Sequence, residues 1–344
     1  MRYTAGLLLL AVIAGHVTDA GAQSGDGALL QHRGQHPLNA LFGLPAVAAR
    51  PVRDRRWQVA LEHGNSFMGG VRGEEILLLD GESTELVLRH QRQLGTCWQG
   101  EIVLPFVLHT PGWADRAIDE WHQFFRLPDA ERGTYPDDEL LFIWRDAEGR
   151  RREIDEPVGG LGDVQLSVQR TLGCRRGRSR AADGAIARLG IKLPSGSADR
   201  LLGSGAADLY VDLQSPVRSL ARRWRGGATF GALMTGPSEL FAEQRPLVLF
   251  GAFGLELRLR PRWSAHLQLD WHTPFHDSAL RELGELAASL AVGLRYATGK
   301  SGRFEVSIAE DALIDTAPDI VVRLAWSWAS GRSAPTGIPR PARR

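Results

Sequence analysis

Residues 186–213 read IARLGIKLPSGSADRLLGSGAADLYVDL, which is two alternating runs joined by a link rich in glycine. In the first run, apolar residues alternate with Arg188 and Lys192. In the second run, leucine and valine alternate with Asp208 and Asp212. A period of two, with one apolar and one charged face, is typical of β-strands. The stretch therefore predicts two antiparallel strands joined by a loop.

The same alternation recurs along most of the chain from Trp57 to Trp328. Residues 75–79 and 85–91 flank Asp80-Gly81-Glu82, which predicts a compact hairpin turn between two short strands. Taken over the whole chain, the pattern predicts an all-β domain over residues 57–328. We expect about twelve antiparallel strands, within a range of ten to fourteen.

Two all-β architectures fit this alternation, a soluble β-sandwich and a transmembrane β-barrel. Most of the expected strands have about the length of ~9–11 residues that crosses a bilayer. Their polar face carries full charges in succession, as at Glu256 and Arg258. Trp263 and Trp271 lie at opposite ends of one apolar face, about one hydrocarbon thickness apart. These features favour the transmembrane barrel, and the sandwich remains the alternative.

The last run, residues 319–328, is apolar on one face and ends in Trp326 and Trp328. It resembles the terminal signal by which outer-membrane barrels are recognised, so the barrel-assembly machinery is an expected partner. The tail of residues 329–344 departs from that signal, which usually ends the chain. Its proline and arginine content predicts disorder.

The N-terminus predicts export from the cytoplasm. Arg2, an apolar core and small residues at a cleavage spacing indicate a signal peptide over residues 1–22. With a barrel following it, this predicts the outer membrane of a Gram-negative bacterium. Residues 23–56 are rich in proline and have little periodicity, so we expect an extended arm. A disordered leader is the favoured form of this arm, and a segment entering the barrel lumen is the alternative.

Residues 111–136 interrupt the strand pattern. Ile118, Trp121 and Phe125 have helical spacing, which predicts a short amphipathic helix inside a long loop. With a hairpin at residues 80–82, the strand order places this loop on the same side of the barrel as the chain termini.

Charge and cysteine content exclude some classes of function. The net charge of +1 gives no basic field for nucleic acid. Cys97 and Cys174 are the two cysteines. If one strand intervenes between the strands that carry them, they lie at opposite barrel ends, beyond the ~7 Å Cα limit for a disulfide. We therefore expect two free thiols.

Several short motifs carry a resemblance to a known family. They are Leu79–Glu82, Phe124–Pro128, Gly160–Asp163, Lys192–Gly196, Leu202–Gly205 with Asp208, and Glu310-Asp311 with Pro318-Asp319. Through them the chain resembles the DUF3187 family, a domain-of-unknown-function family of secreted Gram-negative proteins. Arg126 stands where that family's pattern has a glycine. The segment from Lys192 to Gly196 is also similar to outer-membrane channels for hydrophobic or aromatic compounds. The family has no established activity, so the resemblance implies no catalytic residue.

No residue pattern predicts an active site or a metal site. Ser204 lies in Gly-Ser-Gly, but Leu202 occupies the first glycine position of a nucleophile elbow, so a turn is expected. The histidines lack metal-ligand spacing, and we predict no metal or cofactor. His266, Asp270 and His272 share one strand face, where solvation of a lumen is a simpler role than catalysis.

The inward charges are the candidate functional residues, because they line the lumen if the predicted register holds. They are Arg188, Lys192, Asp208, Asp212, Glu256, Arg258, Asp270, Glu305 and Arg323. Mixed signs fit a pore lining, so we predict a channel or passive transporter for small, hydrophobic solutes, with outer-membrane lipid and that solute as partners. The alternatives are a structural or interaction barrel of the cell envelope with a filled lumen, and an outer-membrane lipid hydrolase.

Overall fold

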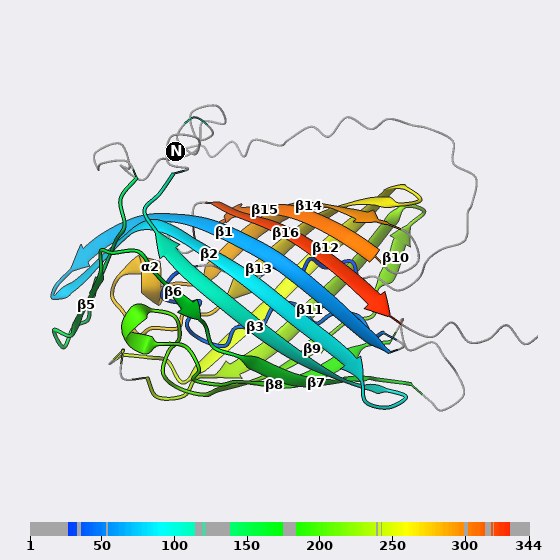
Figure 1. Cartoon of the computed structure of the whole chain (residues 1–344), viewed down its shortest axis with the longest axis horizontal. Helices are drawn as coiled ribbons and strands as arrows, with labels where there is room; N and C mark the ends of the chain where they lie inside the picture. The colour runs from blue at the N-terminus through cyan, green and yellow to red at the C-terminus, as the bar shows by residue number, and fades with distance from the viewer. Residues whose placement is uncertain are drawn as a thin grey trace, which may run out of the picture.

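The computed structural model describes residues 27–32, 36–52, 54–113, 120, 138–174, 184–238, 240–241, 243–298, 302–313, 318 and 320–330. Its main feature is a closed antiparallel barrel of twelve strands (Figure 1). The first strand pairs with the last, which closes the ring. The predicted barrel and its strand number are confirmed, and the alternative of a β-sandwich is not.

The barrel strands are β1 (Arg55–Arg72), β2 (Glu75–Gln93), β3 (Trp98–Thr110), β7 (Gln165–Thr171), β8 (Ile186–Lys192), β9 (Asp208–Gln214), β11 (Trp224–Met234), β12 (Leu247–Arg260), β13 (Trp263–His272), β14 (Ala287–Ala297), β15 (Gly302–Asp311) and β16 (Ile320–Ser330). Shorter elements extend its rims, namely β4 (Leu141–Arg145), β5 (Arg151–Ile154), β6 (Val158–Leu161), η3 (Ala198–Arg200), β10 (Arg218–Ala221) and α2 (Arg281–Gly284). In the described part of the chain, no helix is long and apolar enough to cross a membrane.

The outer face of the barrel is apolar and the inner face is polar. Leu255, Leu267 and Val292 stand side by side on β12, β13 and β14, and Leu267 is 42% exposed. Aromatic residues gather where strands begin or end near the chain termini, at Trp57, Trp98, Trp224, Trp263, Tyr296, Phe304 and Trp328. An apolar belt bordered by aromatic residues is the surface that a transmembrane barrel presents to lipid.

The two ends of the barrel differ. At the end that carries both termini, the turns after β12 and β14 are short. At the opposite end, longer connections follow β3, β8, β11 and β13, and β1 and β2 run on beyond the ring as a hairpin (Figure 1). β4 and β5 extend that hairpin, because β4 pairs with the distal part of β2. We call these the terminal end and the loop end.

The predicted hairpin at residues 80–82 is wrong. Residues 75–93 form one continuous strand, and the chain turns at Gly73-Glu74, where Gly73 has φ +62°. Gly81 marks close packing, because a Cβ there would lie 2.9 Å from the Leu140 side chain. With one strand fewer before β3, that strand runs the other way. β3 therefore ends at the loop end, and the expectation that the connection after it leaves from the other end is also wrong.

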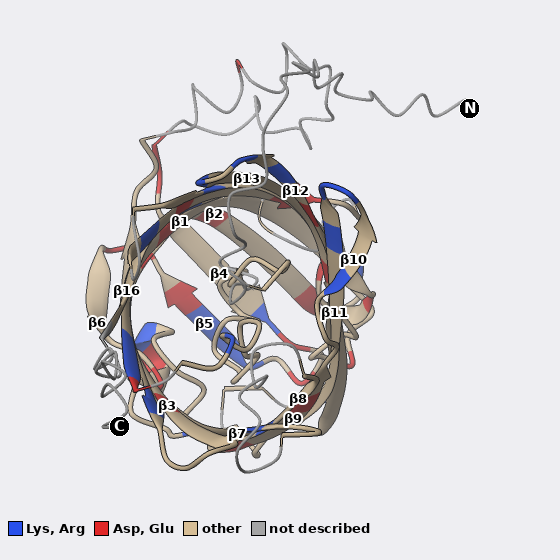
Figure 2. Cartoon of the chain, turned by 90° about the vertical axis from the view of Figure 1, so that its right-hand side faces the viewer, with Lys and Arg blue, Asp and Glu red and all other residues tan. Residues whose placement is uncertain are grey.

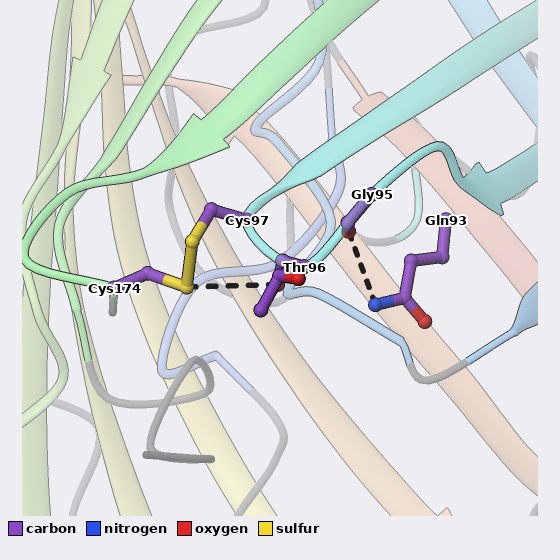
Figure 3. The surroundings of a disulfide bond; sticks show 5 residues. All are labelled: Gln93, Gly95, Thr96, Cys97 and Cys174. Carbon is purple, nitrogen blue, oxygen red and sulfur yellow. Dashed lines mark hydrogen bonds between the residues drawn. A yellow bond between two sulfur atoms is a disulfide. The ribbon is translucent and has the colours of Figure 1, made fainter. Parts of the chain in front are cut away.

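The expectation of two free thiols is wrong as well. Cys97 and Cys174 form a disulfide with a Cα–Cα distance of 5.8 Å (Figure 3). β4, β5 and β6 do not cross the barrel, so β3 and β7 are neighbours in the ring. Cys97 precedes β3 and Cys174 follows β7, which places both at the terminal end.

The structure also corrects the expectation of a disordered leader. Residues 27–32 and 36–52 lie inside the barrel, where wall side chains bond to them. Figure 2 looks into the barrel from the terminal end and shows coil within the ring of strands. We call these residues the lumen arm. The predicted signal peptide, most of the predicted helix in residues 111–136 and the tail after residue 330 lie outside the described residues.

Candidate functional site

The lumen arm runs up the barrel and back, as the blue trace among the strands in Figure 1 shows. Gly27 and Leu29 lie near the terminal end, where both carbonyls accept hydrogen bonds from Arg295. Leu41 is near the loop end, beside the last residue of β8. The arm then returns, and the Val52 carbonyl accepts a hydrogen bond from Gln99 near the start of β3. The two limbs touch where Gln31 Nε2 donates to the Val47 carbonyl.

A row of alternating charges holds the first limb. Arg295, Glu305, Arg323 and Glu62 come from the adjacent strands β14, β15, β16 and β1. Glu305 accepts from Arg295 and Arg323, both at 2.6 Å, and Arg323 Nε lies 3.0 Å from Glu62. Arg295 Nη1 also donates a hydrogen bond to the Gly27 carbonyl of the arm. Buried charges are tolerated when each is paired and hydrogen-bonded, as they are here.

A second group holds the returning limb at mid-barrel. Arg188 Nε lies 2.7 Å from Asp212 Oδ2, and the other end of the guanidinium donates to the Ala46 carbonyl at 2.8 Å. The Ala49 carbonyl accepts from both Gln91 and Gln169. The side chains of the wall therefore hydrogen-bond to the arm mainly at its backbone carbonyls.

Lys192 joins the arm to the loops at the loop end. Its Nζ lies 2.8 Å from Asp163 and 2.9 Å from Asp208, and it donates to Ser204 and to the Leu41 carbonyl. Asp208 also accepts from the Gly43 amide at 2.8 Å. The Asp163 carboxylate receives amides of the loop after β8, and Asp208 receives the amide of Gly236 after β11. We call Lys192, Asp163, Asp208 and Ser204 the lysine latch.

An apolar cluster closes the loop end above the lysine latch. Its centre is Phe42 of the arm, which is stacked on Phe275 with ring centroids 4.8 Å apart. The other members come from β1, β2, β4, β9, β11, β12 and the loops, and include Leu77, Phe142, Trp144, Leu201, Phe241 and Leu280. His276 meets the rings of Phe42 and Phe241 at 5.6 and 4.7 Å. Burial, with a smaller contribution from neighbouring His272, lowers the pKa of His276 to about 3.

The space left between arm and wall is small. Three cavities of about 50, 30 and 20 Å³ lie beside the arm. A water molecule needs roughly 10–15 Å³ by this measure, whereas an apolar cavity of about 150 Å³ is known to hold benzene. Each of these cavities can hold water but not an aromatic solute. With the arm in place, the described lumen is closed to solutes of that size.

Eight of the nine predicted residues have a clear place inside the barrel. Those that are buried are Arg188, Lys192, Asp208, Asp212, Glu256, Glu305 and Arg323. Glu256 is paired with Arg225 at 2.6 Å. Asp270 borders the largest of the three cavities. Arg258 is half-buried at the terminal end of β12, where pairing with β13 becomes irregular. The structure thus brings six of the predicted charges into three separate groups along the arm, and Glu256, Arg258 and Asp270 lie outside these groups.

Sequence reasoning missed several wall residues that hold these groups together. They are Glu62, Gln91, Gln99, Glu101, Asp163, Gln169 and Arg295. Most occupy inward positions of alternating runs, so the signal was present in the polar face as a whole. Within the described residues, no group of three or more His, Cys, Asp or Glu is placed to hold a metal ion.

Comparison with known proteins identifies the family. The model of the family described as "Protein of unknown function (DUF3187)" matches residues 7–329. The chain belongs to this family. No curated protein sequence matches the chain. The matched span takes in the lumen arm as well as the barrel, so both are parts of a DUF3187 chain.

Solved structures share the barrel fold. The COG4313 outer membrane channel from Pseudomonas putida F1 superposes with a TM-score of 0.54 at 15% sequence identity, over 81% of this chain and 96% of that one. The P. putida toluene transporter TodX gives a TM-score of 0.40 at 10% identity, over 81% and 91% of the two chains. The CymD monoaromatic hydrocarbon channel gives 0.40 at 8% identity, over 82% and 90%. At these identities the likeness concerns the fold alone.

Proposed function

We propose that this DUF3187 protein is a passive outer-membrane channel for small hydrophobic solutes, closed by its own lumen arm in the conformation described. The observation that carries the proposal is the way the wall holds the arm. Arg188, Lys192 and Arg295 all donate to backbone carbonyls of the arm. A segment held through its backbone inside a complete barrel can withdraw and leave the wall intact, and the lumen then opens.

The apolar cluster supports a hydrophobic solute. Phe42, Phe241 and Phe275 lie with Trp144 in the apolar cluster at the loop end of the lumen. An apolar solute that enters there replaces contacts between aromatic rings by contacts with itself, at little cost in free energy. A polar solute would have to leave its water to cross the same layer.

The apolar belt and the aromatic residues at the terminal end support a location in the outer membrane. Closed barrels leave no unpaired sheet edge, which is why they can span lipid. β1 begins and β16 ends at one end of this barrel, beside its short turns. Short turns on the periplasmic side are usual for outer-membrane barrels, so we place the loop end outside the cell.

A reversible tether of the arm tests the channel. Val47 of the arm and Ala252 of β12 belong to one apolar cluster with Leu29 and line the same cavity, so cysteines at both positions can be joined by a short bis-methanethiosulfonate cross-linker that reductant cleaves. With the cross-link closed, we expect no conductance above that of an empty planar bilayer. After reduction, we expect conductance and faster uptake of a small hydrophobic dye by cells that carry the protein.

Two controls accompany the tether. Wild-type protein with and without reductant corrects for opening of the Cys97–Cys174 disulfide. The single variants Val47→Cys and Ala252→Cys correct for the substitutions themselves. Equal conductance and uptake in the cross-linked and reduced states would overturn the channel.

The alternatives make different predictions in the same experiment. A structural barrel with a filled lumen gives no flux in either state, and the complete pairing of Glu305 and Arg323 is compatible with it. A lipid hydrolase needs an activated nucleophile. Ser204 Oγ is buried and donates to the Ala206 carbonyl, so it is not placed to attack a substrate. We therefore assign no enzymatic role to it.

A further inference from the structure

The largest of the three cavities lies between the arm and four adjacent wall strands, β11 to β14, and it also reaches Arg188 of β8, whose guanidinium donates to Asp212 and to the Ala46 carbonyl. The volume of this cavity is about 50 Å³. The wall side is formed by Thr229, Ala252, Asp270 and Ser289, and the arm side by His36, Asn39 and Val47. Thr229, Ala252 and Ser289 have short side chains and therefore leave a space here. Elsewhere in the lumen, longer charged side chains fill the corresponding space.

Three polar atoms face this cavity without a hydrogen-bond partner among the described residues. They are His36 Nε2, Asn39 Oδ1 and Thr229 Oγ1, and all three side chains are more than nine-tenths buried. His36 Nδ1 accepts from the amides of Leu38 and Asn39, so the proton of the neutral ring is on Nε2. His36 thus offers a donor, Asn39 an acceptor, and Thr229 either.

Two further residues add acceptors. Both carboxylate oxygens of Asp270 accept from Gln268 Nε2 at 2.9 Å, and within the described part of the chain no ion pair of Asp270 is present. His272 Nδ1 donates to the Thr273 carbonyl at 3.0 Å, which leaves its Nε2 as an acceptor. Phe250 and Trp271 supply an apolar surface beside them.

The balance of these groups selects the chemistry of a ligand. Asp270, Asn39 and His272 all offer acceptors, whereas His36 alone must donate. A buried polar atom without a partner raises the free energy of the folded protein, so a molecule that satisfies several of them gains affinity. A solute without a donor, such as a carboxylate, leaves these acceptors without a partner.

We propose that this cavity is a binding site for a small solute that carries a hydroxyl or amino donor on a compact apolar body, and that it binds solutes without such a donor more weakly. The proposal rests on the channel function, because a solute that crosses the barrel beside the arm would bind in this cavity on its way. It names the solute class that the channel favours. A volume of about 50 Å³ admits only a few non-hydrogen atoms, so the smallest solutes bind without displacing the arm.

Four matched probes test the site in the full chain with the arm in place. They are 2-fluoroethanol, 2-fluoroethylamine, 1-fluoropropane and fluoroacetate, which are small enough for the cavity. Binding to the detergent-solubilised protein is followed by ¹⁹F NMR line width, with empty micelles as reference. We expect the alcohol and the amine to bind at least tenfold more tightly than 1-fluoropropane and fluoroacetate, which have no donor.

Variants separate the cavity from other sites on the protein. Ala252→Leu fills the cavity and is expected to abolish binding of all probes. Asp270→Asn replaces one of the two acceptor oxygens by an amide donor and is expected to weaken binding of the alcohol and the amine. Asp199→Asn, an exposed position on η3, is the matched control and should leave every probe unchanged.

Equal binding of the four probes, or binding that Ala252→Leu does not reduce, would overturn the site. These outcomes are independent of the tether experiment. Donor-selective binding without any flux after reduction of the tether would leave the site standing and refute the channel. Flux without donor-selective binding would support the channel and refute the binding site.

Discussion

Lys192 Nζ lies 2.9 Å from Asp208 Oδ2, and each partner of this ion pair also bonds the backbone of the lumen arm. Lys192 donates to the Leu41 carbonyl, and Asp208 accepts from the Gly43 amide. The same two side chains face each other in the register of β8 and β9. One pair of the barrel wall therefore fixes the turn of the arm, and it is the point from which we expect opening to begin.

Replacing Lys192 by methionine should release the tip of the arm. The change leaves the buried carboxylates of Asp163 and Asp208 without their cation, which typically costs about 3–5 kcal/mol in a protein interior. We expect a higher open probability in planar bilayers than for the wild type. Because the barrel strands keep their hydrogen bonds, the protein should still show heat-modifiable mobility on gels.

A second variant at the same place controls for misfolding of Lys192→Met. Gly43→Val keeps all the charges but puts a Cβ about 2.8 Å from Lys192 Cβ, so the arm tip must move. It should raise the open probability as Lys192→Met does, while the exposed change Asp199→Asn should not. A closed channel in both variants would show that the lysine latch does not hold the arm.

Acidification should favour opening through His276. Burial lowers the pKa of His276 to about 3 in the closed form, with His272 nearby, and the same holds for His36. An exposed histidine titrates near 6.5, so below that pH the open form binds a proton that the closed form does not. The closed form is thus fully stable above pH 6.5 and loses stability as the pH falls towards 3.

At pH 5 this difference amounts to about 2 kcal/mol for one histidine, since each pKa unit corresponds to about 1.4 kcal/mol. Open probability measured between pH 7 and pH 5 should therefore rise in the wild type. His276→Phe keeps an aromatic ring among Phe42 and Phe241 but cannot titrate, and its response should be weaker. An identical pH response in the variant would exclude His276 as its source.

The disulfide should stabilise the terminal end of the barrel without affecting the arm. Cys97 and Cys174 are separated by 77 residues, and closing a loop of that length is worth about 4 kcal/mol in the chain-entropy model. The double variant Cys97→Ser/Cys174→Ser should unfold at lower temperature in a gel-mobility assay. Reduction of the wild type should lower the transition to the same temperature, while conductance stays as it was.

The barrel could be predicted because its signal is local. Arg188 and Lys192 alternate with apolar residues over seven positions, and the facing strand shows the same period at Asp208 and Asp212. Both pairs meet in the structure because β8 and β9 follow each other along the chain and pair in register. By contrast, Arg323 pairs with Glu62 of the first strand, and that contact exists only because the ring closes.

An extended arm was predicted, but its place inside the lumen stood only as the alternative to a disordered leader, for a different physical reason. The residues that the wall grips include Gly27, Leu29, Ala46 and Ala49, and the bonds go to their carbonyls. Backbone carbonyls are the same in every residue, so such contacts leave no periodic pattern in the sequence. The disulfide was missed because the run around Phe142 looks like a barrel strand, although it belongs to a hairpin outside the ring.

A charge placed on the outer face should show whether lipid covers it. Leu267 is at the middle of β13, between Leu255 and Val292, and points outwards. In a membrane, Leu267→Arg should destabilise the folded barrel by about 2–4 kcal/mol, because the bilayer midplane penalises an arginine by that amount. In water the same exposed substitution should cost almost nothing. Urea unfolding in lipid vesicles measures the difference, with Arg200→Glu on the exposed η3 turn as the control that should leave stability unchanged. Equal stability of Leu267→Arg and the wild type would mean that this face does not contact lipid.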